Sequence, residues 1–437
     1  MAQSMVASAT ELRKHWRMLG ETIGNRQAGS DEEQQAANYI EKQFKRFGLA
    51  NIHQHRFDFP NSTSVTHTAK VAVRGGTWRN LKSGPFTYSA DTATKGVTGA
   101  LAYLEDGSPL NFKQNLKGKV GVLIGSLSLV DEELKQRLRQ SKLAALLAVD
   151  ARTPHNWRVP AGAAPQWMQN YDLPTVGIPF LEATTLLRQM PLKANVTVKS
   201  RTFPDTSQNV IGEVVGRKHP DQVIIVCGHH DCVWGTVGAD DNGSGVIFTL
   251  ELARLFAKTR PLRTIRFISY GVEERLSVGA YAYFRSLTPR QRKELIFCLN
   301  ADGIADHLGP DLVRVTGNPG VEKIIAHHWQ RCGHPTQVQT ELSPFSDHIA
   351  ANFSGAPSVF LGRSGLSWKL HSVHDNLDNV SVPVISRTIQ TSAKLLKKIA
   401  NTQHLPFRSK LSPHVQRQVQ AMAKKFYHHP WSPQQFR

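Results

Sequence analysis

Histidine and carboxylate residues occur at five places in the second half of the chain, in groups that could hold metal ions. The first two places lie between His229 and Gly245, directly after the apolar run "QVIIVCG". Histidine nitrogens and carboxylate oxygens are the ligands of Zn²⁺ and similar ions at hydrolytic centres. The residue types therefore predict a metal centre that activates water. The candidate residues are His229, Asp231, Asp240, Asp241, Glu273, Glu274, Asp302, His371, His374, Asp375 and Asp378.

A two-metal centre makes specific demands on such residues. It needs a carboxylate that bridges two ions about 3.5–4 Å apart, together with terminal carboxylates and imidazoles. One further carboxylate must stay off the ions and accept a proton from water. Glu273 and Glu274 are adjacent and follow an apolar run, so their side chains cannot easily point the same way. One of them can bind metal while the other faces the substrate.

Each group also has an ordinary explanation when it is considered alone. A glutamate pair is usually a solvated surface, and the "DNGSG" stretch is common turn chemistry. The "HHD" stretch could equally be a loop with a histidine that packs in the core. The ordered set, with each member at the end of a predicted strand, favours a site over unrelated surface residues.

The elements that must position these groups begin after Gln208. Apolar strands alternate there with helices: "QVIIVCG", "SGVIFTLELARLFAK", "RTIRFISYG", "VGAYAYFRSL" and "LIFCLNADG". Strands of this kind predict an α/β fold with a mostly parallel or mixed sheet, covered by helices on both faces. Ligands of such sheets bind beyond the carboxyl ends of the strands. Because each polar group follows a strand, all of them can meet at one edge.

The rest of the chain predicts further organisation. Near the N-terminus, Ser30 and Glu33 form a capping-box pattern before an apolar-periodic stretch that ends at Gly48, which predicts a helix. Residues 60–203 are rich in short strands, prolines and glycines, with one helix in "DEELKQRLRQSK", and predict a compact β-rich lobe. We therefore expect four segments: residues 1–59 and 204–404 as a catalytic domain, 60–203 as an inserted lobe, and 405–437 as a basic tail.

The net charge of +19 favours attraction to anionic surfaces or acidic substrates. The segment 405–437 contains six Lys or Arg residues and no acid, and we expect it to be a solvated, partly ordered tail. A nucleic-acid-binding function needs a basic cluster on a recognisable fold as well as charge. No nucleic-acid partner is therefore expected.

The cysteines and the apolar runs bear on the cellular environment. Four scattered cysteines, without a CxxC pair, predict free thiols and favour a reducing cytoplasm, and Cys227 and Cys298 fall in predicted strands. No apolar run approaches the roughly 20 residues that cross a bilayer. The first residues show no signal-peptide pattern, although a secreted protein whose signal was removed is the alternative.

The ordered motifs resemble those of the M28 zinc peptidases, which are co-catalytic two-zinc aminopeptidases and their relatives. The family patterns H-x-D, G-x-D-[DN]-x-x-S-G, E-E, N-x-D and H-[ST]-x-x-D correspond to "HHD", "GADDNGSG", "EE", "NAD" and "HSVHD" in this chain. The resemblance covers residues 208–398 and the N-terminal stretch "TIGNRQAGSDEEQQAANYI". The stretches "GVTGALAYLEDG", "LKGKVGVLI" and "AALLAVD" also look like the protease-associated (PA) insert of many members.

The resemblance implies a ligand set for two Zn²⁺ ions. Asp241 would bridge both ions. Glu274 and His371 would complete one site, and His229 and Asp302 would complete the other.

The resemblance also implies roles for residues off the ions. Glu273 would be the general base, and Asp231 would hydrogen-bond the far nitrogen of His229. Asp240 would support Asp241, while His230 and His374 would be bystanders or rim contacts.

The chain departs from the family pattern at two places. Leu370 and Phe345 stand near positions where family aminopeptidases often have a tyrosine, so the oxyanion donor stays open. Arg275 and Leu276 replace the glycine that usually follows the glutamate pair. Arg275 could bind a substrate carboxylate, although a surface salt bridge is the more ordinary expectation.

Together these patterns predict a two-metal aminopeptidase that acts on peptides with a free N-terminus. A carboxypeptidase or dipeptidase of the same family is the nearest alternative, and it would need an arginine clamp for the terminal carboxylate. A glutaminyl cyclase fits less well, because that branch resembles a one-metal site. A catalytically inactive binding module is the alternative from another class, and the complete ligand set argues against it. The preferred side chain and the oligomeric state stay open.

Overall fold

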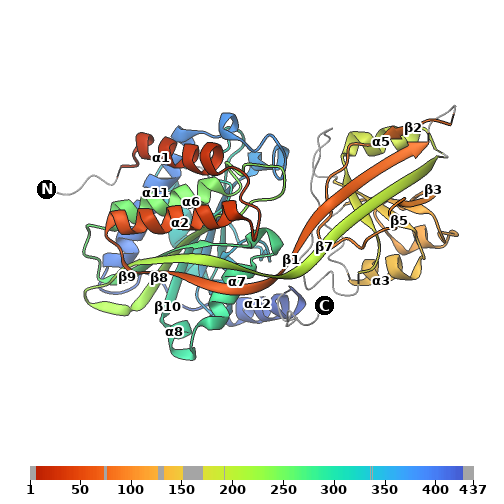
Figure 1. Ribbon diagram of the computed structural model, residues 1–437. Helices are drawn as coiled ribbons and strands as arrows, with labels where there is room; N and C mark the ends of the chain where they lie inside the picture. The colour runs from red at the N-terminus through yellow and green to blue at the C-terminus, as the bar shows by residue number, and fades with distance from the viewer. Residues whose placement is uncertain are drawn as a thin grey trace. The chain divides into compact units, whose positions relative to one another are not determined.

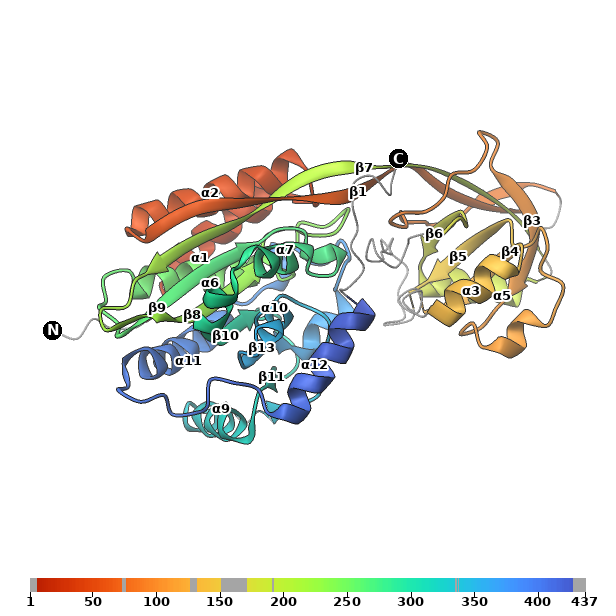
Figure 2. The same cartoon turned by 90° about the horizontal axis from the view of Figure 1, so that it is seen from below.

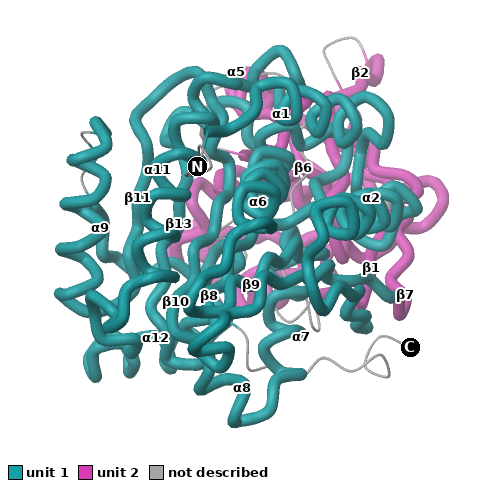
Figure 3. Tube along the Cα trace, turned by 90° about the vertical axis from the view of Figure 1, so that its left-hand side faces the viewer, with its two compact units in different colours: residues 1–58, 206–370, 374–430 teal, residues 59–205, 371–373, 431–437 magenta. Residues whose placement is uncertain are grey.

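The computed structural model describes residues 6–72, 76–125, 132–150, 171–190, 192–334, 336 and 338–426 of the 437 residues. The chain folds into two compact units (Figure 3). The first unit contains the described parts of residues 1–58, 206–370 and 374–430, and the second contains those of 59–205 together with 371–373. The chain leaves and re-enters the first unit within two long strands, β1 (Ala50–Ala72) and β7 (Lys193–Val214).

A mixed sheet forms the centre of the first unit. Its strand order is β12-β11-β13-β10-β8-β9-β7, and β1 pairs with β7. The four central strands β13, β10, β8 and β9 run parallel, whereas β11 and β7 run antiparallel to β13 and β9. The predicted α/β fold with a mostly parallel sheet is thus confirmed. The strands are β8 (His219–His229), β9 (Arg263–Tyr270), β10 (Leu295–Ala301), β11 (Asp311–Thr316), β12 (Val338–Gln339) and β13 (Ser358–Arg363).

Helices cover both faces of this sheet (Figures 1 and 2). One face carries α1 (Ala9–Trp16), α2 (Asp31–Phe47), α6 (Gly243–Phe256), α9 (Pro319–Arg331) and α11 (Val382–Asn401). The other face carries α7 (Val278–Ser286), α8 (Pro289–Glu294), α10 (His348–Phe353) and α12 (Pro413–Phe426). Shorter helical turns are η1 (Arg17–Ile23), η4 (Glu273–Arg275), η5 (Ser364–Trp368) and η6 (Leu377–Asn379).

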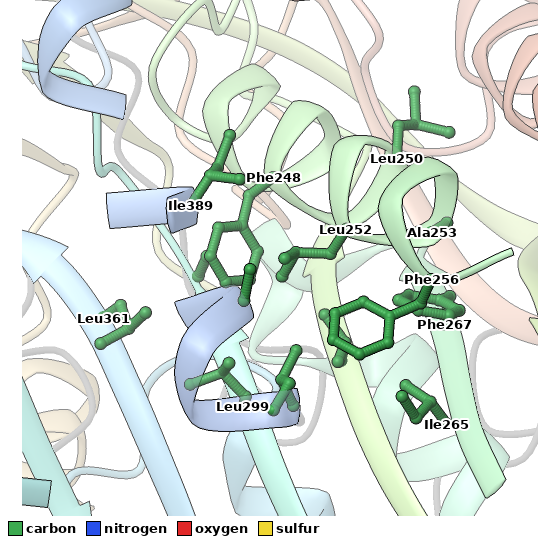
Figure 4. Close-up of a cluster of buried hydrophobic side chains, with 14 of the residues drawn as sticks. Phe248, Leu250, Leu252, Ala253, Phe256, Ile265, Phe267, Leu299, Leu361 and Ile389 are labelled. Carbon is green, nitrogen blue, oxygen red and sulfur yellow. The ribbon is translucent and has the colours of Figure 1, made fainter. Parts of the chain in front are cut away.

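The two helical layers bury opposite faces of the same strands. In β8, Ile224 and Val226 join the larger core, whereas Ile225 and Cys227 join the core on the α7 and α10 side. This alternation follows from the two-residue period of a strand. Helix α6 is buried almost all round and packs against strands β8, β9 and β10 and helix α11, and Figure 4 shows part of the core that they share. The side chains labelled there are Phe248, Leu250, Leu252, Ala253, Phe256, Ile265, Phe267, Leu299, Leu361 and Ile389.

Helix α2 begins and ends where the sequence predicts. The Ser30 hydroxyl accepts a hydrogen bond from the Glu33 amide, and Gly48 ends the helix with a φ of 81°. The expected capping box is wrong in its second half. The Glu33 carboxylate accepts a hydrogen bond from the amide of Gly29 instead of that of Ser30, and it reaches inward to the site described below.

The second unit has a hydrophobic core of its own, between a short sheet and helix α5 (Phe180–Arg188). Strands β3, β4, β5 and β6 run parallel in that order, and β3 pairs antiparallel with β7. The sequence predicts helix α3, whereas it gives no indication of α5. The elements are β2 (Trp78–Asn80), β3 (Val97–Tyr103), η2 (Pro109–Phe112), β4 (Val120–Ile124), α3 (Glu132–Gln140), β5 (Ala145–Val149), β6 (Thr175–Ile178) and α5 (Phe180–Arg188).

The C-terminal segment packs on the first unit as far as residue 426. Phe407 lies against Phe297 with ring centroids 5.5 Å apart, and Leu411 donates its amide to the carbonyl of Gly355. Val419 of α12 is fully buried. The expectation of a solvated tail is therefore wrong for residues 405–426, because apolar side chains at these positions are buried. Residues 427–437 lie outside the described residues.

Helix α10 begins at a buried histidine that should make the protein sensitive to acid. Burial lowers the pKa of His348 to about 3, and neither ring nitrogen has a hydrogen-bond partner among the described residues. An unfolded chain protonates this side chain below about pH 6.5, so its contribution to stability is present above that pH and is lost as the pH falls. We expect unfolding free energy to fall by about 2 kcal/mol more in the wild type than in His348→Phe between pH 7 and pH 5.

Urea unfolding at the two pH values measures this difference. The ring of His348 packs against that of Phe360 at 5.6 Å, so phenylalanine retains the contact. Substitution of the exposed His404 in the same way is the control, and it should reproduce the wild-type loss. An equal loss in wild type and His348→Phe would contradict the prediction.

Candidate metal centre

The candidate ligands lie at the carboxyl ends of three neighbouring parallel strands. His229 is the last residue of β8, Asp302 follows β10, and Glu274 lies in η4 just after β9. Asp241 stands two residues before α6, which follows β8. Ligand atoms of His229, Asp241 and Glu274 all lie within 4.8 Å of one another. The sheet edge thus brings together residues that are up to 73 positions apart in the chain.

The spacing around His229 fits a bound zinc ion. Its Nε2 atom lies 3.5 Å from Asp241 Oδ1 and 3.6 Å from Asp302 Oδ1. Ligands at tetrahedral angles and about 2.0–2.1 Å from zinc lie about 3.3 Å from each other. The Nε2 atom is buried and has no hydrogen-bond partner among the described residues. A buried imidazole nitrogen surrounded by carboxylates beyond hydrogen-bond distance is the donor set that a divalent cation would satisfy.

The electrostatics of the site point the same way. Burial opposes the charged form of His229, but the carboxylates of Glu273 and Asp302 outweigh it and hold its pKa well above the usual range. Burial raises the pKa of Glu273 to about 8, the nearby imidazole of His229 opposes this rise, and the charge of Asp302 adds to it. The protein alone therefore crowds more negative charge here than it can balance, and positive ions would relieve that excess.

Asp231 links the histidine to the glutamate pair. Its Oδ1 atom lies 3.4 Å from His229 Nδ1, and its backbone carbonyl lies 3.2 Å from the same nitrogen. The two carboxylate oxygens also accept the amides of Glu273 and Glu274, at 2.9 and 3.1 Å. Burial raises the pKa of Asp231, but the His229 ring and the Glu273 amide outweigh it and lower that pKa. One ionised carboxylate thus positions three residues of the site.

Glu33 is a buried residue of the site that its sequence pattern did not reveal. Its Oε1 atom accepts the hydroxyl of Ser207 at 3.0 Å and the amide of Val272 at 3.2 Å. Burial and the charge of Asp231 raise the pKa of Glu33 to about 8. Two buried carboxyl groups, those of Glu33 and Asp231, thus accept three consecutive amides. These are the amides of Val272, Glu273 and Glu274, at the start of the turn that carries the glutamate pair, here called the glutamate turn.

Arg26 is a second supporting residue of the site that the sequence pattern does not indicate. Its side chain is completely buried, and Nε donates to the carbonyl of His230 at 2.7 Å. Its terminal nitrogens donate to the carbonyls of Val237 and Gly238, at 2.7 and 3.0 Å. The N-terminal segment thereby fixes the loop between β8 and α6, which carries Asp241.

A buried ion network supports the loop at Asp240 and Asp241. The ammonium group of Lys369 lies 3.0 Å from Asp240 and 3.0 Å from Asp306, and it donates to the carbonyl of Asn379. The carboxylate of Asp375 accepts the amides of Asp240 and Asp241, at 2.8 and 3.0 Å. Burial and the charges of Asp240 and Asp241 raise the pKa of Asp375 to about 8. Asp240 is thus oriented toward Lys369, away from the cluster of three.

The carboxylate of Glu273 is held by one of its two oxygens. Oε1 accepts the Ser277 hydroxyl at 2.9 Å and the Ser346 amide at 3.1 Å. Oε2 lies 3.7 Å from His229 Nε2, next to the predicted metal position. The Ser346 hydroxyl donates to Asp302 Oδ2 at 2.6 Å, so the same residue touches a candidate ligand.

The remaining candidates have different surroundings. His371 belongs to the short segment 371–373 that groups with the second unit, so its role as a ligand stays a prediction. His230 is buried, its Nδ1 lies 3.0 Å from the Ser269 hydroxyl, and burial lowers its pKa to about 3. The ring of His374 lies 5.9 Å from that of Trp368. Arg275 is only 7% exposed, so it is buried and does not lie on the surface as expected.

Within the described residues, no helix is both long enough and apolar enough to span a membrane. All four cysteines are free thiols, as predicted, and Cys227 and Cys298 lie in β8 and β10.

Comparison with known proteins identifies similar sequences and folds. Residues 209–396 match the model of peptidase family M28. Aminopeptidase YwaD of Bacillus subtilis is 29% identical over 288 residues, which are 65% of this chain and 59% of that protein. Carboxypeptidase Q of Xenopus laevis is 26% identical over 378 residues, or 82% of this chain and 79% of that protein. The zinc aminopeptidase BSAP of Bacillus subtilis has the same fold, with a TM-score of 0.74, 21% identity and coverage of 94% of this chain and 99% of that one.

Proposed function

We propose, from the match of residues 209–396 to the model of peptidase family M28, that the chain is a two-zinc exopeptidase of that family. Its most fitting activity is that of an aminopeptidase, which hydrolyses the bond after the first residue of a peptide with a free N-terminus. The observation that carries the proposal is the cluster of His229, Asp241 and Glu274, in which the Nε2 atom of His229 has no hydrogen-bond partner among the described residues. Aminopeptidases among the similar proteins support the same substrate class.

The proposed ligand set divides between two ions. His229 and Asp302 would hold one ion, and their closest atoms are 3.6 Å apart. Glu274 and His371 would hold the other, and Asp241 would bridge the two. Each of these side chains supplies the nitrogen or oxygen donors that zinc prefers.

The chain's own groups would manage the protons of the reaction. Zinc bound here would lower the pKa of a water molecule and polarise the scissile carbonyl. Glu273 would accept a proton from the attacking water through Oε2, because Oε1 is occupied by Ser277 and Ser346. It would then return that proton to the leaving amine. Asp231 would hold His229 and the glutamate turn in fixed positions relative to each other during the reaction.

A carboxypeptidase is the second candidate function. It is favoured by the similarity to carboxypeptidase Q, which extends over 82% of this chain. Such an enzyme would need a cation for the terminal carboxylate of its substrate, and the buried Arg275 next to Glu274 is one candidate. A catalytically inactive binding module is the remaining alternative.

A substrate panel separates these functions. We expect the purified protein to release the chromophore from aminoacyl anilides, to lose that activity when zinc is removed with a chelator, and to recover it when zinc is restored. An N-acetylated anilide should be inert, because an aminopeptidase requires the free amine. Cleavage of N-blocked dipeptides instead would indicate a carboxypeptidase. A zinc-loaded protein that cleaves neither class would be the binding module.

We also propose that the second unit influences substrate choice, in the manner of a PA-like insert. It has its own core, so its removal should leave the first unit able to fold. Replacement of residues 60–203 by a short linker should change the ranking of aminoacyl anilides more than it changes zinc content. Kinetics on the panel and elemental analysis measure the two effects, and an equal loss of both would contradict a selective role.

A further inference from the structure

The turn that carries the glutamate pair has three residues in the left-handed region. Val272, Leu276 and Ser277 have φ values of 56°, 69° and 48°, although none of them is glycine. Non-glycine residues with such angles are strained and persist only where surrounding contacts fix them. The backbone strain is the most unusual at Val272, because β-branched residues very rarely adopt a positive φ. Because backbone strain of this kind is concentrated at functional sites, the strain on both sides of Glu273 indicates that this turn has a function.

Ser277 occupies the N-cap position of α7, but it does not cap that helix. A serine there usually accepts a backbone amide of the first turn through its hydroxyl oxygen. In this structure the side chain makes no capping hydrogen bond. Its hydroxyl instead points back along the chain and donates to Glu273 Oε1 at 2.9 Å, while its amide donates to the Glu273 carbonyl at 2.8 Å. The stabilising role that explains serine at most helix starts is thus absent.

The left-handed backbone is what brings this hydroxyl to the carboxylate. Ser277 is completely buried, so its hydroxyl cannot exchange Glu273 for bulk water. Together with the amide of Ser346, it gives Oε1 two donors and fixes the rotation of the carboxylate plane. The free oxygen, Oε2, is then the one that faces the candidate ligands, at 3.7 Å from His229 Nε2.

We propose that Ser277 is a positioning residue for the general base. It acts through Glu273: it holds Oε1 so that Oε2 stays available to the water from which the proton is taken. This inference rests on the proposed function, because it concerns the same base. It goes beyond the ligand set, because the Ser277 hydroxyl and amide both donate to Glu273, which is not one of the candidate ligands.

Two substitutions separate positioning from structural support. Ser277→Ala removes the hydroxyl and keeps the strained backbone, whereas Ser277→Gly removes the hydroxyl and relieves the strain. We expect kcat to fall on the order of tenfold in both variants with KM nearly unchanged, as for loss of an outer hydrogen-bond partner. The unfolding temperatures should differ, with that of Ser277→Gly no lower than that of the wild type. Zinc content by elemental analysis should match the wild type in both.

Ser286→Ala is the matched control. It removes a hydroxyl from the same helix, where that hydroxyl donates to the Tyr283 carbonyl at 2.7 Å, and it should leave kcat unchanged. If kcat followed the unfolding temperature, so that the glycine variant recovered activity, the role of Ser277 would be structural and the assignment wrong. If wild type and control cleave aminoacyl anilides and both Ser277 variants match them, the assignment alone fails. If the wild type cleaves no substrate of the panel, the proposed function fails and the assignment with it.

Discussion

Replacement of Asp241 by alanine should remove zinc from both positions and abolish turnover. Asp241 is the one candidate ligand assigned to both ions, so its loss leaves each ion with an incomplete set of donors. Loss of a hydrogen-bond partner outside the metal shell typically weakens zinc binding or activity by about 10–100-fold, and loss of a bridging ligand should cost more. We expect zinc content to fall from close to two equivalents to well below one after dialysis, with activity at the detection limit.

Elemental analysis of dialysed protein measures the metal directly, without reference to activity. The matched control is Asp221→Ala, because Asp221 is an exposed carboxylate on the same strand, β8, far along it from His229. That variant should retain the zinc content of the wild type.

The unfolding temperature is a second measurement of zinc binding, because a ligand that binds only the folded state stabilises it by mass action. Added zinc should raise the unfolding temperature of the wild type and of Asp221→Ala, and leave that of Asp241→Ala unchanged. An Asp241→Ala protein that still holds two equivalents would exclude the bridging assignment.

The sequence predicts the fold and the proximity of the central candidate ligands because both depend on short-range patterns. Runs such as "QVIIVCG" and "LIFCLNADG" are apolar on both faces of a strand, which only a sheet covered by two layers of helices can bury. Once the strands are parallel, their carboxyl ends must share an edge. His229 and Asp302 therefore come together without any knowledge of side-chain packing, and the structure places their closest atoms 3.6 Å apart.

The supporting residues could not be found in this way, because their partners are set by tertiary packing. Glu33 stands in a pattern that predicts a local capping box, yet its carboxylate reaches Val272, 239 positions away. Lys369 looks like an ordinary surface lysine in "SWKLHS", and only the folded chain buries it between Asp240 and Asp306. The prediction of a solvated basic tail was wrong for the opposite reason. Its charges suggested solvent, while scattered apolar residues such as Phe407 and Val419 were enough to dock it.

Ser277 illustrates the same limit at the shortest range. A serine just before "VGAYAYFRSL" is an unremarkable helix start in the sequence. The hydroxyl reaches Glu273 only because Leu276 and Ser277 adopt left-handed backbone angles, which neither residue type predicts.

Substitution of Glu273 by glutamine should reduce turnover by about 10²–10⁴-fold while the protein keeps its zinc. Glutamine has the shape of glutamate, and its carbonyl oxygen can still accept the Ser277 hydroxyl and the Ser346 amide that Glu273 Oε1 accepts. Its amide nitrogen would then take the place of Oε2, 3.7 Å from His229 Nε2. An amide nitrogen cannot accept the proton of the attacking water, so the hydrolytic step should lose its base without losing its geometry.

Three measurements together identify that loss as one of proton transfer. Zinc content should equal that of the wild type, which separates Glu273→Gln from Asp241→Ala. KM for an aminoacyl anilide should change little, because the substrate would still meet the same ions and the same loops. The kcat value alone should fall, and Glu105→Gln, an exposed substitution of the same kind in the second unit, should leave it unchanged.

Wild-type turnover in Glu273→Gln would mean that another group takes the proton. A fall in zinc content would mean that Glu273 is a ligand, and the division of labour between the two adjacent glutamates would have to be reversed.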